Sequence, residues 1–446
     1  MHVTICLSLS NRMKAVPPIP LTPPSSISRN EGPLSRVFKG CLGTLDANCI
    51  EKLLLHCGGA LERNDITLAQ QIMWVLNNVA SSVGDPNQRL TSWFLRALIS
   101  RASRVCPSAM NMEASLGAHV ARVRSISVTQ LAGYVDLLPW QSFGFCASNG
   151  AICKAIGSSQ RVHILDISIS HCMQWPTLID SLSKRPEGAP LVRLTVPSTR
   201  PHVPPLLSMS YEEVGHRLSN FAKSRDVPFD FRMIPFEDLP NLRDGVKFHH
   251  ELLMEQLNPS VLDLRDDEAL VVNCQNSVHY LPDEALGIDP CYRDEFLERI
   301  RGFHPTIVTV VDEDYDLGHA SLSSRISSCF NYLWIPFDAL ETFLPKDSCQ
   351  RLEYEADIGF KIENIIAFEG LQRTERLESG TRLVQRMKKA QFYSVPFMED
   401  TAKEVKRLLD EHASGWGMKR DDDMLVLTWK GHNAVFATAW APQPFQ

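Results

Sequence analysis

The sequence predicts an α/β protein: a helical N-terminal cap, then a doubly wound, mostly parallel sheet that ends in an antiparallel hairpin. Three observations predict it. A short apolar run at 161–168 carries an acidic residue near its end and is followed by an amphipathic segment, as in the first strand of a βα unit. Strand-like and helix-like segments alternate after this run but not before it. Near the C-terminus, two strand-like runs are separated by only the four residues 430–433.

Length and composition are those of a globular protein with a substantial core. The chain has 446 residues, of which 44% are hydrophobic and 22% charged. Its formal net charge of −7 gives no overall basic field that would hold it on nucleic acid. The 12 cysteines include no C-x-x-C pair, which argues against a zinc ribbon or a disulfide framework. No apolar run approaches the roughly 18 residues of a membrane span, so we expect a soluble intracellular protein.

The N-terminal third is predicted to hold a tail and a helical cap. Residues 1–40 are rich in proline and serine and are predicted to be disordered. Apolar residues then recur at helical spacing in three segments, which predict helices at about 46–61, 68–79 and 90–101. Short connections between them indicate an antiparallel helical unit within a cap of about 46–145. Their apolar stripes are interpreted as core, with a partner-binding groove as the alternative.

The rest of the chain, about 150–446, is predicted to be a Rossmann-like α/β core. Strands are expected at 161–167, 191–196, 228–234, 269–274 and 306–312. Helices between them are expected at about 172–184, 211–224, 246–257 and 292–301, and later ones at about 320–344, 377–390 and 400–412. Each crossover is long enough to be right-handed, so the five strands should be parallel with helices on both faces. The runs 424–429 and 434–440 should form the closing hairpin, which is the layout of class I methyltransferases.

The turn after the first strand argues against a cofactor site. Dinucleotide and S-adenosylmethionine sites need glycines there, because the backbone must come close to the ligand. Residues 167–175 contain no glycine, and their bulky side chains would fill the space. Asp166 is therefore interpreted as a helix or loop cap rather than a ribose ligand. We expect no catalytic residue, cofactor or metal, and methyl transfer from S-adenosylmethionine is the least favoured alternative.

Two charged clusters have open interpretations. The acidic run 312–316 follows a strand end and is interpreted as a solvated loop, with active-site acids as the alternative. A candidate basic patch could serve nuclear import or contact phosphate, or could simply be a solvated helix face; it consists of Arg382, Arg386, Lys388 and Lys389.

From about residue 46 to 442, the chain resembles the GRAS family of plant transcriptional regulators. The family's VHIID signature is matched, with leucine at its fourth position, by Val162, His163, Ile164, Leu165 and Asp166. The helical region before it resembles the first leucine-rich segment of the family, and 214–231 resembles the second. The PFYRE region is matched by Pro336, Phe337, the stretch 359–370, Arg373, Glu375 and Arg376. The SAW region is matched by Trp416, Gly417, Trp429, Ala439 and Trp440, with Thr438 in place of the serine.

The resemblance implies a nuclear scaffold protein without catalysis that controls gene expression in plant development. It implies two kinds of partner: other GRAS proteins, in homodimers or heterodimers, and zinc-finger transcription factors of the INDETERMINATE-domain type. DNA would be reached mainly through these partners, and no membrane is involved. The lack of a DELLA-type acidic motif argues against a gibberellin-regulated member. The short tail and compact motifs are most similar to the Short-root and Scarecrow-like branches. Direct sequence-specific DNA binding through the basic helix is the alternative.

Overall fold

The computed structural model describes residues 46–105, 125–234, 248–284, 287 and 291–443. The predicted tail at 1–40 lies outside these residues. The chain divides into two compact units, one of residues 1–122 and 319–373 and the other of 123–318 and 374–446. Within the described residues, no helix is both long and apolar enough to cross a membrane.

The first unit is a bundle of helices. The three predicted N-terminal helices are present, and Asp46 and Asp65 cap two of them by accepting backbone N–H groups at 2.9 and 3.1 Å. Two later helices pack against them, chiefly against the first and third. The helices of the unit are α2 (Ala47–Glu62), α3 (Ile66–Val79), α4 (Pro86–Val105), α13 (Leu322–Glu341) and α14 (Cys349–Ala367).

The helices α13 and α14 differ from the sequence prediction. The prediction placed α13 in the α/β core, because it follows the last parallel strand, and gave no helix at 349–367. Both belong to the first unit, since their buried side chains pack on α2 and α4. Gly359 lets α14 lie close to α4: a Cβ at this position would be 2.2 Å from Cε3 of Trp93.

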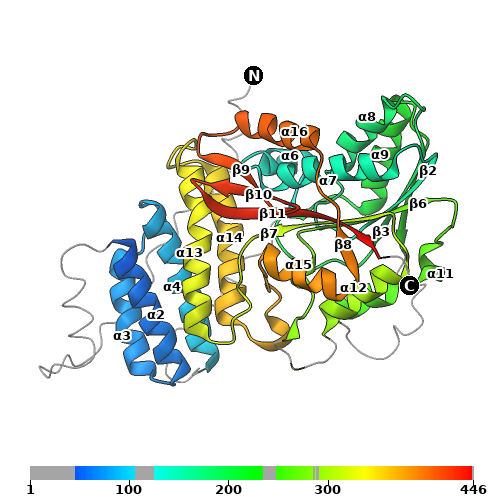
Figure 1. The fold of residues 1–446 in the computed structure, drawn as a ribbon. Coiled ribbons are helices and arrows are strands. Elements are labelled where there is room, and N and C mark those ends of the chain that lie inside the picture. Colours follow the sequence, from blue (N-terminus) through cyan, green and yellow to red (C-terminus); the bar gives the residue numbers. More distant parts are fainter. Residues whose placement is uncertain (1–45, 106–124, 235–247, 285–286, 288–290, 444–446) are drawn as a thin grey trace, which may run out of the picture. The chain divides into compact units, whose positions relative to one another are not determined.

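The second unit contains a nine-stranded mixed sheet (Figure 1). Its five parallel strands are those predicted, and they lie in the order β5-β3-β2-β6-β7. The predicted hairpin follows, with β11 inserted antiparallel between β7 and β10. Two further antiparallel strands, β9 beside β10 and β8 beside β11, were not predicted. The strands are β2 (Arg161–Asp166), β3 (Leu191–Pro197), β5 (Phe229–Ile234), β6 (Ala269–Gln275), β7 (Ile307–Glu313), β8 (Phe392–Ser394), β9 (Trp416–Asp421), β10 (Met424–Trp429) and β11 (His432–Pro442).

Helices cover both faces of this sheet, as expected for a doubly wound fold. On one face, α10, α12 and α15 contribute to a core with β6, β7 and β11, and on the other α7 packs on β6, β7, β10 and β11 (Figure 1). The helix α7 was not predicted, because its own small and apolar residues lie on all of its faces and form no periodic apolar stripe. The helices are α6 (Val128–Val135), α7 (Trp140–Ile156), α8 (Trp175–Ser183), α9 (Tyr211–Ser224), α10 (His249–Gln256), α11 (Pro259–Leu262), α12 (Tyr292–Gly302), α15 (Gly380–Lys389) and α16 (Glu399–Asp410). A small parallel pair, β1 (Ser125–Ile126) and β4 (Leu206–Leu207), completes the unit.

Candidate functional site at the carboxyl ends of the parallel strands

Ligands of open α/β sheets bind outside the carboxyl ends of the parallel strands, so this edge is the candidate site. The VHIID-like residues form β2, the strand between β3 and β6. His163 is buried within it, and its Nε2 lies 2.8 Å from Oγ1 of Thr195 while its Nδ1 lies 3.1 Å from Nη2 of Arg193. Burial and the Arg193 charge lower the pKa of His163 to about 3. The imidazole is therefore neutral at physiological pH and links two strands.

Asp166 ends this strand and is fully buried. It accepts hydrogen bonds from Trp175 Nε1 at 2.8 Å, from Asn273 Nδ2 at 3.1 Å and from the backbone N–H of Ser168 at 3.1 Å. The predicted capping role is thus correct only for the Ser168 amide. The other two donors make the Asp166 carboxylate a junction between β2, β6 and the start of α8.

The loop that leaves β2 turns its side chains inward. Ser168, Cys172 and Trp175 are buried, and Gln174 donates a hydrogen bond to Asn149 at 3.0 Å. His171 and Cys172 have φ angles of 51° and 63°, in the left-handed region that glycine normally occupies. The loop thus makes a glycine-like turn with bulky residues, and the Trp175 indole lies against the carboxylate at the strand end.

A second polar cluster lies at the ends of β6 and β7. His279 is buried between two carboxylates, with Nδ1 2.7 Å from Asp312 and Nε2 3.4 Å from Glu375. Burial alone would disfavour the imidazolium, but the two carboxylates outweigh it and raise the pKa of His279 to about 9. His279 is therefore a cation at physiological pH.

The acidic run 312–316 is not the solvated loop that the sequence predicted. Asp312, Glu313 and Asp314 are all buried. Asp314 accepts the backbone N–H of Gly380 at 2.9 Å and the side-chain amide of Asn433 at 2.7 Å. Because the run leaves the sheet next to β11, its carboxylates are used for internal pairing.

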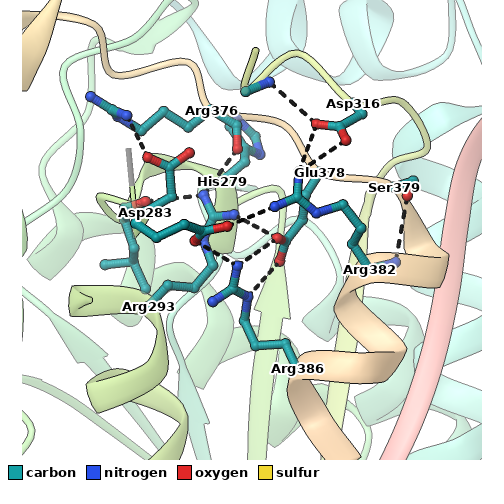
Figure 2. Close-up of polar contacts among 12 residues, drawn as sticks. His279, Asp283, Arg293, Asp316, Arg376, Glu378, Ser379, Arg382 and Arg386 are labelled. Carbon is teal, nitrogen blue, oxygen red and sulfur yellow. Dashed lines mark hydrogen bonds and ion pairs between the residues drawn. The ribbon is translucent and has the colours of Figure 1, made fainter. Parts of the chain in front are cut away.

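One stretch of the chain, which we call the crossing segment (residues 374–379), lies over these strand ends (Figure 2). Arg376 pairs with Asp283 at 2.6 Å, and its backbone N–H donates to the His279 carbonyl at 3.2 Å. Glu378 pairs with Arg293 at 3.0 Å. The chain's own charged and apolar side chains therefore occupy the edge of the sheet beside β6 and β7.

The candidate basic patch lies on α15, and acidic partners surround most of it (Figure 2). Arg382 pairs with Asp316 and Glu284 at 2.9 and 2.7 Å. Arg386 pairs with Glu378 and Glu284 at 3.0 Å each, and also with Asp294. Lys389 pairs with Asp294 at 2.8 Å, whereas Lys388 is exposed. Most of the positive charge of this helix is therefore compensated within the chain.

The remaining motif residues are mainly packing residues. Trp416 and Trp429 lie opposite each other in β9 and β10 with ring centroids 4.8 Å apart, and Gly417 beside them faces Thr428. Trp429, Ala439 and Trp440 are buried. The PFYRE-like residues are divided between the units: Pro336 and Phe337 are buried in α13 and Arg373 ends the first unit, whereas Glu375 belongs to the second.

Sequence reasoning assigned Glu375 and its neighbour Arg376 to the PFYRE-like region but missed their partners in the buried ion-pair network. The only local signal is that a strongly charged stretch, 373–379, has no helical spacing and lies between helices. The residues of the network that it missed are Asp283, Arg293 and Glu378.

Comparisons with known proteins agree on one relationship. The GRAS domain family matches residues 50–441. Scarecrow-like protein 32 of Arabidopsis thaliana is 45% identical over 414 residues, which cover 92% of this chain and 97% of that protein. Protein SHORT-ROOT of Arabidopsis thaliana is 31% identical over 435 residues, 94% and 77% of the two chains, and Scarecrow-like transcription factor PAT1 of the same plant is 28% identical over 420 residues, 91% and 79%. The crystal structure of SCL7 from Oryza sativa superimposes with a TM-score of 0.70 at 25% identity and covers 88% of this chain and 99% of that one.

Proposed function

This chain belongs to the GRAS domain family of transcriptional regulators, and we propose that it acts in the nucleus as a co-regulator that binds other transcription factors. It would function as a scaffold in the control of plant development, with no substrate of its own. The observation that carries the proposal is the filled edge of the sheet. An α/β enzyme would bind its ligand at this edge. In this chain, the Trp175 indole is instead hydrogen-bonded to Asp166 there, and the crossing segment lies beside β6 and β7.

The core is best understood as a class I methyltransferase-like scaffold. Five parallel strands followed by the inserted antiparallel β11 support this relationship. The methyltransferase layout would then supply a rigid framework, while its ligand edge has become internal structure.

We propose two kinds of partner, other GRAS proteins and zinc-finger DNA-binding proteins of the INDETERMINATE-domain type. The family membership supports both, and the net charge of −7 supports an indirect route to DNA, since phosphate binding needs uncompensated cations. Direct DNA binding through α15 is the second candidate, but the ion pairs of Arg382 and Arg386 disfavour it.

A gel-shift experiment with the purified full chain tests the proposal. The probe is a short duplex that carries the site of an INDETERMINATE-domain zinc-finger protein, and the chain is added alone or with that protein at physiological salt. We expect no discrete shift from the chain alone and a further-retarded band when it joins the zinc-finger complex. A salt-resistant shift by the chain alone would overturn the proposal, as would the absence of any further-retarded band.

A matched variant separates the two candidate functions. Lys388→Ala combined with Lys389→Ala removes the two exposed lysines of α15 but leaves Arg382, Arg386 and their carboxylates in place. The co-regulator proposal predicts an unchanged further-retarded band. Loss of DNA binding with retained zinc-finger binding would instead support direct DNA contact.

A further inference from the structure

The strand β5 (Phe229–Ile234) forms one end of the nine-stranded sheet, and among the described residues it pairs only with β3, in parallel. The N–H of Val192 in β3 donates to the carbonyl of Pro228 at 2.9 Å. Because alternate residues of a strand direct their backbone groups to the same side, 228, 230 and 232 face β3. The N–H and C=O groups at the outer edge therefore belong to Phe229, Phe231 and Met233. An exposed edge of this kind accepts a further strand unless something blocks it.

The two faces of β5 differ in chemistry. Its apolar face carries the half-buried side chains of Phe229, Phe231 and Met233. Phe231 packs against Gly215, so α9 lies over this face. Its charged face carries Asp230, which is exposed, and Arg232. A strand that fits beside β5 must therefore alternate strictly between apolar and polar residues.

The start of this edge is accessible in the described part of the chain. An open hollow of about 450 Å³ lies beside Phe229. It is lined by Ser219, Lys223, Asp226, Val227, Pro228 and Phe229. The hollow leaves room for side chains that an added strand would bring next to α9.

The strand β9, at the opposite end of the sheet, is a poorer acceptor. Its last three residues, 419–421, are all charged and exposed. Arg420 is also held by the chain itself, since it pairs with Glu399 at 3.0 Å and donates to the Phe397 carbonyl at 3.1 Å. Charged side chains on an edge strand oppose the addition of another strand. Of the two edges, β5 is therefore the one suited to pairing.

The sequence contains a segment that matches these requirements, although it lies outside the described residues. Residues 3–10 alternate without exception, with valine, isoleucine and two leucines at the odd positions and threonine, cysteine and two serines at the even ones. Strict alternation over four to eight residues is typical of a strand with one apolar face. The segment contains neither proline nor charge, in contrast to the proline-rich stretch that follows it.

We infer that residues 3–10 pair with the outer edge of β5 in the same chain, as a further strand of the sheet. The odd-numbered side chains then extend the apolar face of β5, and the even-numbered ones lie beside its charged face. A shift by one residue would exchange the two faces of the segment, so the pairing can shift only in steps of two. This matching of faces holds for a parallel as well as an antiparallel strand.

The connection to the first helix is long enough for this contact. Residues 11–45 are 35 residues, which span roughly 115 Å when extended. A folded chain of this length has a radius of gyration of about 22 Å. The tether also gives the segment an effective concentration on the order of 1 mM at the edge, so an intrinsic affinity in the millimolar range is sufficient. Backbone hydrogen bonds and a few apolar contacts can supply an affinity of that size.

Disulfide formation in the full-length chain tests the contact, with Cys6 as the native probe. Asp230→Cys and Arg232→Cys each place a second thiol on the charged face of β5, where Cys6 is expected. In a glutathione redox buffer, the effective concentration of Cys6 for at least one of these thiols should exceed that for the matched control, Lys419→Cys on β9, by about tenfold or more. Mass spectrometry of the cross-linked peptides identifies the pair that forms.

An exchange of two neighbouring residues separates pairing from mere tethering. Cys6→Leu combined with Leu7→Cys keeps the composition and reach of the segment but moves the thiol to its apolar face. In the Asp230→Cys and Arg232→Cys backgrounds, this exchange should reduce the effective concentration to that of the Lys419→Cys control. Hydrogen exchange gives a second measurement: the amides of Phe231 and Met233 should exchange about tenfold faster or more when Ile5→Pro and Leu7→Pro are introduced.

Several results would overturn the contact, provided that the unfolding midpoints of the variants match the wild type. Equal effective concentrations at 230, 232 and 419 would do so, as would a disulfide that survives the exchange at positions 6 and 7. A disulfide that joins two copies of the chain would show that the segment does not pair within its own chain. Unchanged hydrogen exchange in the proline variant would show that the outer edge of β5 is not paired with residues 3–10. The gel shift with the zinc-finger protein does not depend on any of these results, so the proposed function is tested separately.

Discussion

Replacing Asp166 by asparagine tests whether the strand end is an internal junction. The Asp166 carboxylate is fully buried, with one oxygen accepting from Trp175 and the other from Asn273 and the Ser168 amide. Asparagine would put an NH₂ group in the place of one of these oxygens, so this hydrogen-bond donor would face the donor that the oxygen had accepted from. One charge-assisted hydrogen bond, worth about 1.5–3 kcal/mol, is lost, and an unsatisfied buried donor costs about 1–3 kcal/mol more. Asp166→Asn should therefore lower the free energy of unfolding by about 4 kcal/mol.

A double-mutant cycle with Trp175→Phe isolates the contact itself. Trp175→Phe has a packing cost of its own, which is the same whether residue 166 is aspartate or asparagine. This cost therefore cancels in the cycle. In the Trp175→Phe background the donor is absent, so Asp166→Asn should cost about 2 kcal/mol less than in the wild type. The assay is urea unfolding followed by far-ultraviolet circular dichroism. An Asp166→Asn variant within about 0.5 kcal/mol of the wild type, or strictly additive costs, would refute the reasoning.

Three further predictions follow from single contacts. The pKa of His279 is about 9 in the folded chain, above its ordinary 6.5, so its ion pairs contribute fully to the free energy of unfolding below pH 6.5 and no longer above pH 9. Between these pH values the free energy of unfolding should fall by an amount on the order of 3 kcal/mol, and His279→Gln should not show this fall. Urea unfolding measured across this pH range checks the prediction. Gly359→Ala should lower the unfolding free energy by about 1–3 kcal/mol, because its Cβ would overlap Trp93 and the overlap outweighs the gain in helix propensity. Arg386→Ala should cost about 1–3 kcal/mol, since it removes one of the two cations that pair with the buried Glu378 and with Asp294, whereas Lys388→Ala should stay within about 0.5 kcal/mol in the same assay.

Controls and contradicting outcomes differ among these three. Equal pH slopes for the wild type and His279→Gln would show that other groups cause the pH dependence. Gly133→Ala is the control for the helix glycine, because nothing lies within 4 Å of its added Cβ; it should stabilise by about 0.5–1 kcal/mol. A destabilised Gly133→Ala, or a neutral Gly359→Ala, would contradict the packing argument. Equal costs for Arg386→Ala and Lys388→Ala would show that the ion pairs of α15 contribute little.

Buried apolar runs made the parallel strands predictable from sequence. The run at 191–196 has turn residues on both sides and lies within one residue of the observed β3. The helix α14 escaped prediction for the opposite reason, because it directs charge inward. Glu355 is buried in an ion pair with Arg89 at 3.0 Å, and no local pattern marks a buried carboxylate whose partner lies 266 residues away.

The same limit applies to the candidate site. The absence of glycine after β2 correctly indicated side chains that turn inward at this loop. The crossing segment could not be inferred, because Arg376 and its partner Asp283 are 93 residues apart and each resembles an ordinary surface charge in sequence. The strand β9, with a glycine and three charged residues among its six, likewise lacks the alternation that identifies a strand.

Calorimetric titration of the full chain with S-adenosylmethionine tests the central claim most directly, that the ligand edge of the sheet is filled by the chain's own side chains. The account predicts no saturable heat at millimolar ligand, because Trp175 and the loop after β2 fill the carboxyl end of this strand, where open α/β sheets bind their ligands. Saturable one-to-one binding at micromolar ligand would contradict it.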